Sequence, residues 1–374
     1  MAIEGDVVAV HSYWTDDGSR IITEAQVRAP DGSEVTVSQL GGSADGIGMV
    51  VFDGTPLLEL GMTVALAAHR GLDLSQQEHL VLDSARVLAE PAGFVRTGPT
   101  KGGKSLYWES GCVFITLDAD GTKAIAGDGE FAVIDATIAT WNNGTSSCSY
   151  LKLMDEGRKA QEVGRDGVNL IKFRDTTWGR PAIGKDPARA YNAAAQAITT
   201  VVFIDDPGNA RDGAILDADV ELNGVNDAIS VNGVTTSSAP CKAELQNTLT
   251  HELGHLQGLE HTCLAQGDPA RVDNLGNPVP FCNQTSDPRI LNAVMYNNAS
   301  CGETSKETLS PDDVNAICTA YPTARNPGTC EHVGTATGGC CSASGPFGRP
   351  DGSFLLAGAT ALFLSRRRKS SHNA

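Results

Sequence analysis

One stretch of the chain decides its fold: His251-Glu252-Leu253-Gly254-His255-Leu256-Gln257-Gly258-Leu259-Glu260-His261. On a helix that turns about 100° per residue, His251 and His255 share one face, so their imidazoles can bind a single metal ion. Glu252 points away from both rings and can reach a water molecule on the ion without binding the ion itself. Gly258 tolerates the left-handed conformation that ends a helix, which would return His261 to the ion as a third ligand.

The residue types in this stretch match a catalytic zinc site. Three neutral imidazoles occupy three positions of a tetrahedral zinc ion and leave the fourth for water. Such an ion lowers the pKa of water to about 7 and polarises a carbonyl. Glu252 would accept the proton of this water and later donate it to the leaving amine. A bare H-E-x-x-H could also be an amphipathic helix with two surface histidines, but the added glycine and third histidine favour the zinc site.

The same helix carries an apolar stripe opposite the histidines. Its members are Leu245, Leu249, Leu253 and Leu256. We expect this stripe to pack on the core, so that the histidines face a cleft.

With its long histidine motif the chain resembles the metzincin zinc peptidases. The run Asn292-Ala293-Val294-Met295-Tyr296 is similar to the Met-turn of that clan, and its Val-Met-Tyr form is most similar to the matrixin branch. The resemblance implies that Met295 lies under the metal as structural support and is not a ligand. It also implies an α+β catalytic domain with a twisted mixed sheet, an active-site helix and peptide-bond hydrolysis.

Composition narrows the class of protein. The 374 residues are enough for two domains, and the net charge of −17 without a basic stripe argues against nucleic acid as a partner. Ten cysteines without a C-x-x-C pair indicate mostly disulfides in an exported protein. Their pairing does not follow from the sequence.

An N-terminal module is expected over residues 1–92. Short apolar runs alternate with turn residues, including Asp-Gly at 17–18, 31–32 and 53–54, which is typical of an all-β barrel or sandwich. No catalytic constellation occurs in it. Residues 93–104, rich in Pro, Gly and Thr, are predicted to be a linker.

The catalytic domain is predicted over residues 105–325. A strand through Cys112–Leu117 is followed by a helix that contains Trp141, an order that resembles the start of a matrixin catalytic domain. The continuously apolar run 199–204 predicts a strand in the centre of the sheet. Ser310 and Pro311, followed by two acids, predict the start of the last helix.

Residues 214–223 alternate acidic with small or apolar side chains, which predicts an edge strand. In metzincins the strand at the sheet edge holds an extended peptide substrate. The resemblance therefore places substrate along Asp219, Val220 and Glu221. A solvated edge protected by acids predicts the same pattern.

The chain departs from matrixins in two respects. Residues 191–233 contain no histidine, which argues against a second, structural zinc, and the family's latency motif is absent. We expect Cys112 to form a disulfide, with Cys148 as one candidate partner. Disulfides are also expected to cross-link the segment after the zinc motif, through Cys263, Cys282, Cys301 and Cys318. A metal bound by these four cysteines is the alternative. Oxygen ligands for a calcium ion could come from Asp205, Asp206, Asp212, Asp217 and Asp219.

The C-terminal part predicts a sorting tail. Residues 326–352 form a linker with Gly338-Gly339-Cys340-Cys341, and residues 353–374 contain an apolar stretch followed by Arg366-Arg367-Arg368-Lys369. This order resembles the sorting tail of myxobacterial surface proteins, whereas the apolar stretch is shorter than the roughly 20 residues of a membrane span. A frayed tail is the alternative. Export also requires a signal peptide, which the residues after Met1 do not form, so we expect the natural chain to begin upstream.

We therefore predict an exported, monomeric zinc metalloendopeptidase at the cell surface or outside the cell, with protein or peptide substrates and membrane contact only through its tail. His251, His255 and His261 bind zinc and Glu252 is the general base and acid. A surface-binding protein that kept the fold without catalysis is the main alternative, although it would need the histidines and not Glu252. A hydrolase of non-peptide substrates is a third hypothesis.

Overall fold

The structure is a computed structural model that describes residues 1–16, 19–44, 47–49, 57–72, 78–89, 93–181, 188–266 and 268–333. The chain divides into two units, Met1–Thr335 and Ala336–Ala374. The second unit, with the predicted Gly-Cys motif, apolar stretch and Arg-rich end, lies outside the described residues. Among the described helices, none has the length and apolar character that a membrane crossing requires.

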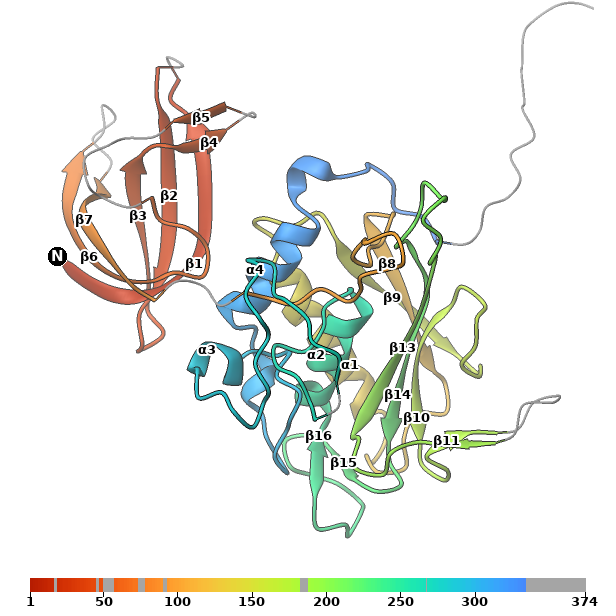
Figure 1. Ribbon diagram of the computed structural model, residues 1–374. Helices are drawn as coiled ribbons and strands as arrows, with labels where there is room; N and C mark the ends of the chain where they lie inside the picture. The colour runs from red at the N-terminus through yellow and green to blue at the C-terminus, as the bar shows by residue number, and fades with distance from the viewer. Residues whose placement is uncertain are drawn as a thin grey trace, which may run out of the picture. The chain divides into compact units, whose positions relative to one another are not determined.

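Residues 2–89 contain a closed β-barrel (Figure 1). Its strands run in the order β1-β2-β3-β7-β6, with β3 and β7 parallel and the other pairs antiparallel, which is the Greek-key arrangement of small five-stranded barrels. Their bounds are β1 (Ala2–Trp14), β2 (Ile21–Arg28), β3 (Glu34–Leu40), β6 (Thr63–Leu72) and β7 (Glu78–Ala89), with a small hairpin of β4 (Gly42–Ala44) and β5 (Ile47–Met49).

Alternation of side chains explains the barrel. Along β2 every second residue is buried, among them Ala25 and Val27, and these pack with Val7 and Val64 in a core of the barrel's own. The predicted turn at Asp31-Gly32 joins β2 to β3, and Gly32 has the positive φ of 82° that favours glycine. The all-β prediction for this module is confirmed, whereas the Asp-Gly pairs at 17–18 and 53–54 lie outside the described residues.

A five-stranded mixed sheet forms the centre of the second part of the chain. Its order is β13-β14-β10-β8-β9, in which only β13 runs antiparallel to its neighbour. The strands are β8 (Cys112–Asp118), β9 (Lys152–Lys159), β10 (Asn169–Arg174), β13 (Ala197–Phe203) and β14 (Ile215–Asn223). Two short pairs complete the β-structure: β11 (Gly179–Arg180) with β12 (Arg189–Ala190), and β15 (Ala228–Ser230) with β16 (Lys242–Glu244).

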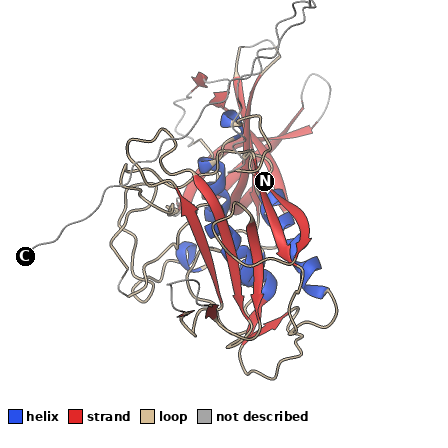
Figure 2. Cartoon of the chain, turned by 90° about the vertical axis from the view of Figure 1, so that its right-hand side faces the viewer, coloured by secondary structure: helices blue, strands red, loops and turns tan. Residues whose placement is uncertain are grey.

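The helices are α1 (Gly129–Gly144), α2 (Leu245–Leu256), α3 (Pro288–Leu291), α4 (Pro311–Ala320) and the 3-10 turns η1 (Ser305–Glu307) and η2 (Thr323–Arg325). Of these, α1 and α2 lie against the five-stranded sheet, as Figures 1 and 2 show. The leucine stripe of α2 is buried as predicted, at Leu245, Leu249, Leu253 and Leu256. Ser310 caps α4 in a capping box with Asp313, which confirms the predicted start of that helix.

The structure reverses the predicted places of two strands. β13, expected in the sheet centre, is the edge strand, and β14, expected at the edge, lies between β13 and β10. Asp219, Val220 and Glu221 are fully or almost fully buried, so the prediction that they form the substrate edge is wrong. The acids of β14 resembled an edge because they lie on the sheet face opposite the helices, while Ala218 and the other alternate residues join the core.

These buried acids bind the segments that cover the far face of the sheet. Asp217 accepts the backbone N–H groups of Asp166 and Gly167, and Asp219 accepts those of Gly164 and Leu170. Each carboxylate therefore fixes a loop in place of contacting solvent.

Glu221, two residues after Asp219 on β14, connects several segments on the same face of the sheet. It pairs with Arg174 at 2.6 Å and Arg180 at 2.8 Å and accepts the Tyr191 hydroxyl. The carboxylate thus joins β10, β11 and the segment after β12.

The predicted linker 93–104 belongs to the second part of the chain. Phe94 and Val95 are buried, Thr97 N–H donates to the Gly258 carbonyl, and Glu260 N–H donates to the Val95 carbonyl. This segment therefore packs along the end of the histidine motif, and the linker prediction is wrong for its described residues. Its Pro, Gly and Thr content indicates turns and does not report burial.

Eight cysteines form four disulfides: Cys112–Cys330, Cys148–Cys318, Cys241–Cys301 and Cys263–Cys282. The prediction of mostly disulfides holds for the described residues, but the pairing of Cys112 with Cys148 is wrong. Gly111 N–H donates to the Thr329 carbonyl, which places Cys330 beside the start of β8. Residues 326–333 therefore pack on the sheet and are not a linker.

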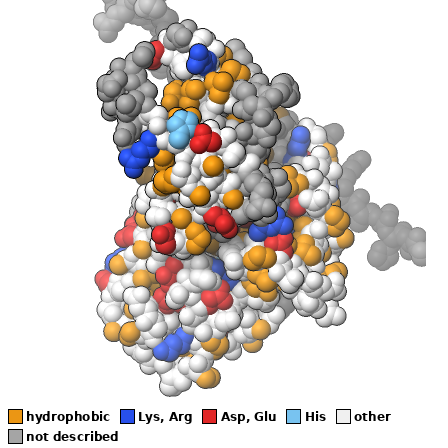
Figure 3. All heavy atoms as spheres, turned by 90° about the vertical axis from the view of Figure 1, so that its left-hand side faces the viewer, with side chains coloured by type: hydrophobic (Ala, Val, Ile, Leu, Met, Phe, Trp, Pro, Cys, Tyr) orange, Lys and Arg blue, Asp and Glu red, His pale blue; other side chains and the backbone are white. Residues whose placement is uncertain are grey.

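Charges lie in small mixed groups on the described surface. Arg28 pairs with Glu34 at 2.8 Å, and Arg271 lies between Glu260 and Asp268. On the face in Figure 3 the described Lys and Arg side chains lie singly among acidic ones.

We expect Glu221→Gln to lower the free energy of unfolding by about 3 kcal/mol, because it leaves two guanidinium groups without their buried partner. Glu162→Gln is the matched control: Glu162 pairs with the same Arg174, but its side chain is 53% exposed and that of Glu221 is 0% exposed. An exposed pair contributes less than about 1 kcal/mol. Urea denaturation at pH 7 measures both, and equal losses would contradict the buried network.

The pKa of Asp219 predicts a pH dependence of stability. Burial, together with the charge of Asp217, raises this pKa from 3.8 to about 7, against the opposing hydrogen bonds from Leu170 and Gly164. The folded protein therefore binds this proton more tightly than the unfolded chain, and the stabilisation is full below pH 3.8 and lost as the pH rises through about 7.

Asp219→Asn should remove this contribution. We expect the free energy of unfolding of the wild type to fall more steeply between pH 4 and pH 7 than that of the variant, with parallel curves above that range. Denaturant titrations at a series of pH values measure the difference. Curves that run parallel over the whole range would refute the assignment.

Candidate metal centre

Three histidines converge on one point beside α2. The Nε2 atom of His261 lies 3.3 Å from that of His251 and 3.1 Å from that of His255. Zinc–nitrogen bonds of about 2.0–2.1 Å at tetrahedral angles place nitrogens about 3.3–3.4 Å apart, so the spacing fits one ion. These three side chains could hold a metal ion, and they are the only such group of His, Cys, Asp and Glu in the part of the chain that the structure describes.

Backbone carbonyls orient two of the rings. His251 Nδ1 lies 2.6 Å from the Val294 carbonyl oxygen, and His255 Nδ1 lies 2.9 Å from that of Leu259. A proton on each Nδ1 donates to its carbonyl, which leaves the Nε2 lone pairs directed at the common centre.

The surroundings keep the imidazoles of His251 and His261 neutral, as metal ligands must be. Burial lowers the pKa of His251 well below its ordinary value, and the neighbouring histidines act in the same direction. Burial also lowers the pKa of His261 to about 3.

Gly258 makes the return of His261 possible. It has a φ of 89°, and a Cβ there would lie 3.0 Å from the Leu106 carbonyl oxygen. The chain turns at this point, directly after α2, so that Leu259 accepts from His255 and His261 reaches the centre. The predicted role of Gly258 matches this geometry.

Met295 lies under the histidine helix. It is buried, and a Cβ on Gly254 would come within 2.2 Å of its sulfur and 3.3 Å of Trp141. Gly254 is therefore required for the close approach, although it is not one of the metal-binding residues. The backbone around Met295 also contacts both ligand segments: Val294 accepts from His251, and Met295 accepts from Thr262 N–H.

Asp313 of α4 fixes that turn from the other side. Its Oδ2 accepts Val294 N–H at 3.0 Å as well as the Ser310 N–H and hydroxyl. The cap of α4 thus holds the carbonyl that orients His251.

Glu252 lines the same cavity as the three histidines but is not one of the possible metal ligands. Its Oε2 accepts the Thr199 hydroxyl of β13 at 2.6 Å. Burial raises the pKa of this carboxyl, while His255 and the Thr199 hydrogen bond oppose the shift. A carboxyl of raised pKa, held by one oxygen, is suited to accept and return a proton.

A cavity of about 640 Å³ opens beside the histidines. It is lined by the edge strand β13, by Thr248 and Glu252 of α2, by the loop 296–299 and by Lys306. Asp219, Val220 and Glu221 do not line it.

The residues missed by sequence reasoning come from two sources. Thr199 lies on the strand that was expected in the sheet centre, and its hydroxyl was therefore not considered. Thr248 and Lys306 reach the cavity through the packing of η1 on α2, where Lys306 N–H donates to Asn247. Thr248 lies one turn before Glu252, a signal that could have been used.

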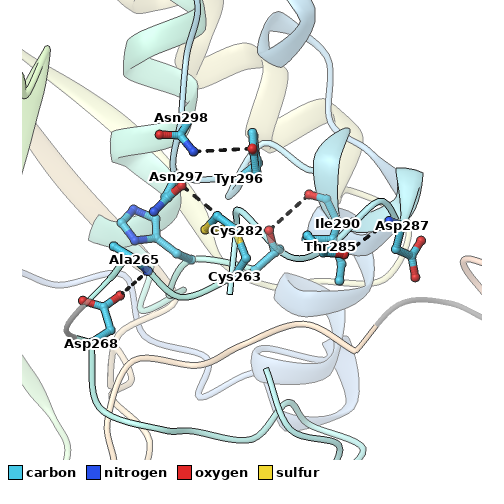
Figure 4. Close-up of a disulfide and its surroundings, with 12 residues drawn as sticks. Cys263, Ala265, Asp268, Cys282, Thr285, Asp287, Ile290, Tyr296, Asn297 and Asn298 are labelled. Carbon is cyan, nitrogen blue, oxygen red and sulfur yellow. Dashed lines mark hydrogen bonds between the residues drawn. A yellow bond between two sulfur atoms is a disulfide. The ribbon is translucent and has the colours of Figure 1, made fainter. Parts of the chain in front are cut away.

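The disulfide Cys263–Cys282 closes the loop that follows His261 (Figure 4). Figure 4 shows Asn297 directed at Cys263 and Asn298 directed at the Tyr296 hydroxyl. The loop after Met295 is therefore in contact with the stapled segment after the third histidine.

The carboxylates considered for calcium have protein partners. Asp205 accepts Lys101 N–H, Asp206 accepts Gly208 N–H, and Asp212 accepts the Thr100 hydroxyl, while Asp217 and Asp219 bind the loops described above. Within the described ranges the five acids form no metal-binding group.

No family model matches the chain, and no curated protein is significantly similar to it in sequence. The site therefore has to be interpreted from its own geometry.

We expect the full chain to bind one equivalent of Zn²⁺ and the variants His255→Ala and His261→Ala to bind it more than about 100-fold more weakly, since losing an outer partner already costs about 10–100-fold. Titration against a chromophoric chelator measures the affinity. His11→Ala, in the barrel, is the control. Unchanged affinity in both site variants would refute the metal centre.

Proposed function

We propose that this chain is a zinc-dependent metalloendopeptidase of the metzincin clan, closest in its motifs to the matrixins. One observation carries the proposal: the Glu252 carboxylate and three convergent imidazoles line a cavity that the sheet's edge strand also lines. A metal, a base and a peptide-binding edge are the parts that peptide-bond hydrolysis needs.

The edge strand supplies the proposed substrate site. β13 pairs with β14 on one side, and its other side faces the cavity. An extended peptide can pair with that free side by strand addition, so that its backbone is held in register beside the histidines. This places substrate on β13 and not on β14.

Glu252 is the proposed proton carrier. When bound, zinc would acidify water and polarise the scissile carbonyl. Glu252 would take the proton of the attacking water and deliver it to the nitrogen of the leaving amine. Thr199 holds Oε2, which leaves Oε1 for the water, and burial, by raising the pKa of the carboxyl, favours the uptake of the proton from that water.

The alternatives fit less of the site. A silent binding protein would need the histidines as a structural metal site but not a carboxylate buried beside them and oriented by Thr199. A hydrolase of small non-peptide substrates would make no use of an open edge strand along the cavity.

The proposed location is extracellular or on the cell surface. Four disulfides are compatible with an oxidising compartment. The sorting tail over residues 353–374 and its cleavage near the Gly-Cys motif remain part of this proposal.

Glu252→Gln tests the enzyme. We expect cleavage of an unfolded protein such as reduced casein to fall by about 10²–10⁴-fold, the usual contribution of a general base, while Zn²⁺ binding is retained. Glu156→Gln, a surface acid of the same sheet, is the control. A chelator should stop the wild type.

Two results would contradict the proposal. Cleavage by Glu252→Gln at the wild-type rate would remove Glu252 from the reaction. A folded, zinc-loaded wild type that cuts nothing would favour the binding-protein alternative.

A further inference from the structure

Lys306 is one of the residues that line the cavity, although lysine is usually a surface residue. It belongs to η1, and only 4% of its side chain is exposed. Its backbone N–H donates to the Asn247 side chain of α2, which fixes η1 against the helix of the histidines. The ammonium is therefore held in place beside the proposed substrate site.

The ammonium has a donor to spare. Its Nζ lies 2.5 Å from the Asn298 carbonyl oxygen and 3.5 Å from Glu303 Oε1. An ammonium has three N–H groups, and the described part of the chain provides no third acceptor for it. The Tyr296 ring, 5.8 Å away, contributes only its face.

Glu303 forms shorter hydrogen bonds with other groups than its contact with Lys306. Its Oε1 accepts the Ser305 hydroxyl at 2.7 Å and its Oε2 accepts Ser300 N–H at 2.7 Å, both shorter than its contact with Lys306. Glu303 thus shapes the loop. Lys306 lines the cavity, and its ammonium retains an N–H group for which the described residues offer no acceptor.

A second polar group on the same cavity lacks a partner. Thr248 is 5% exposed, and its Oγ1 is buried without any hydrogen-bond partner. Leaving a buried hydroxyl unpaired costs about 1–3 kcal/mol. Since Thr248 lines the cavity one helical turn from Glu252, a ligand there can supply the missing partner.

Resting on the proposed function, we propose that Lys306 and Thr248 determine specificity: the pocket beside the metal centre takes an acidic substrate side chain, Glu or Asp, next to the scissile bond. One carboxylate oxygen accepts from the Lys306 ammonium and the other from the Thr248 hydroxyl. An apolar side chain of the same size would fill the pocket but leave both groups unsatisfied. A basic side chain would meet a like charge.

The test uses the zinc-loaded full chain and a peptide library randomised on both sides of the scissile bond, with cleavage sites read by mass spectrometry. We expect Glu or Asp to exceed Leu at one position adjacent to the bond by at least about tenfold, the value of one charged hydrogen bond. Lys306→Met should abolish the preference, and Lys306→Arg should retain it. Glu303→Gln should increase it.

Thr248→Val guards against a folding artefact. Its hydroxyl has no partner to lose, so the variant should fold and bind zinc like the wild type while the acidic preference falls by severalfold. Melting temperature and Zn²⁺ affinity of each variant are measured alongside. Loss of the preference in Lys306→Met alone, with a lowered melting temperature, would mean a structural lysine and overturn the proposal.

A binding arm separates this inference from the enzyme. The same library is passed over immobilised Glu252→Gln protein with and without Lys306→Met, and the retained peptides are sequenced. Enrichment of acidic peptides that depends on Lys306 supports the proposed pocket even if the wild type cuts nothing. Absence of cleavage by the wild type would contradict only the proposed peptidase activity. Cleavage with no acidic preference, or with a preference for apolar residues, would overturn the pocket and leave the peptidase standing.

Discussion

The convergence of three imidazoles on one point is the constraint on which the rest of this part of the chain depends. Lone pairs about 3.3 Å apart repel one another unless a cation lies between them, so the protein has to hold the rings there by other contacts. It does so with two carbonyls, those of Val294 and Leu259. The first belongs to a turn that Asp313 fixes from α4, and the second follows a glycine with positive φ that segment 95–97 pins in place. Segments that are far apart in the sequence therefore hold the three histidine rings in one arrangement.

The histidine motif made the site predictable because its spacing is local. The positions of His251, His255 and Gly258 follow from helical periodicity and from the conformational freedom of glycine; the structure brings the two histidines together and gives Gly258 a positive φ. The barrel was predictable for a similar reason, since alternation along a strand is also local. Predictions of contacts between distant segments were wrong, as with Cys112, whose partner lies 218 residues away.

The exchange of β13 and β14 shows where such reasoning ends. Apolar character predicts the sheet centre, yet β13 is apolar because it borders a cavity. β14 is acidic because arginines and backbone donors need its carboxylates. A polar side chain needs a hydrogen-bond partner, but the sequence does not show whether that partner is water or another part of the protein. Thr199 and Lys306 stayed hidden for the same reason: each acquires its importance from a neighbour far away in sequence.

The four disulfides are nested, each loop enclosing the next: 112–330, 148–318, 241–301 and 263–282. A single backbone cut anywhere between Cys112 and Cys330 therefore leaves both pieces covalently joined. A cut between residues 89 and 112, by contrast, leaves no covalent bond between the barrel and the rest of the chain, because no cysteine precedes Cys112. Where other proteases are present, the second part of the chain can therefore be cut once and remain one covalent molecule, whereas one cut is enough to end the covalent link to the barrel.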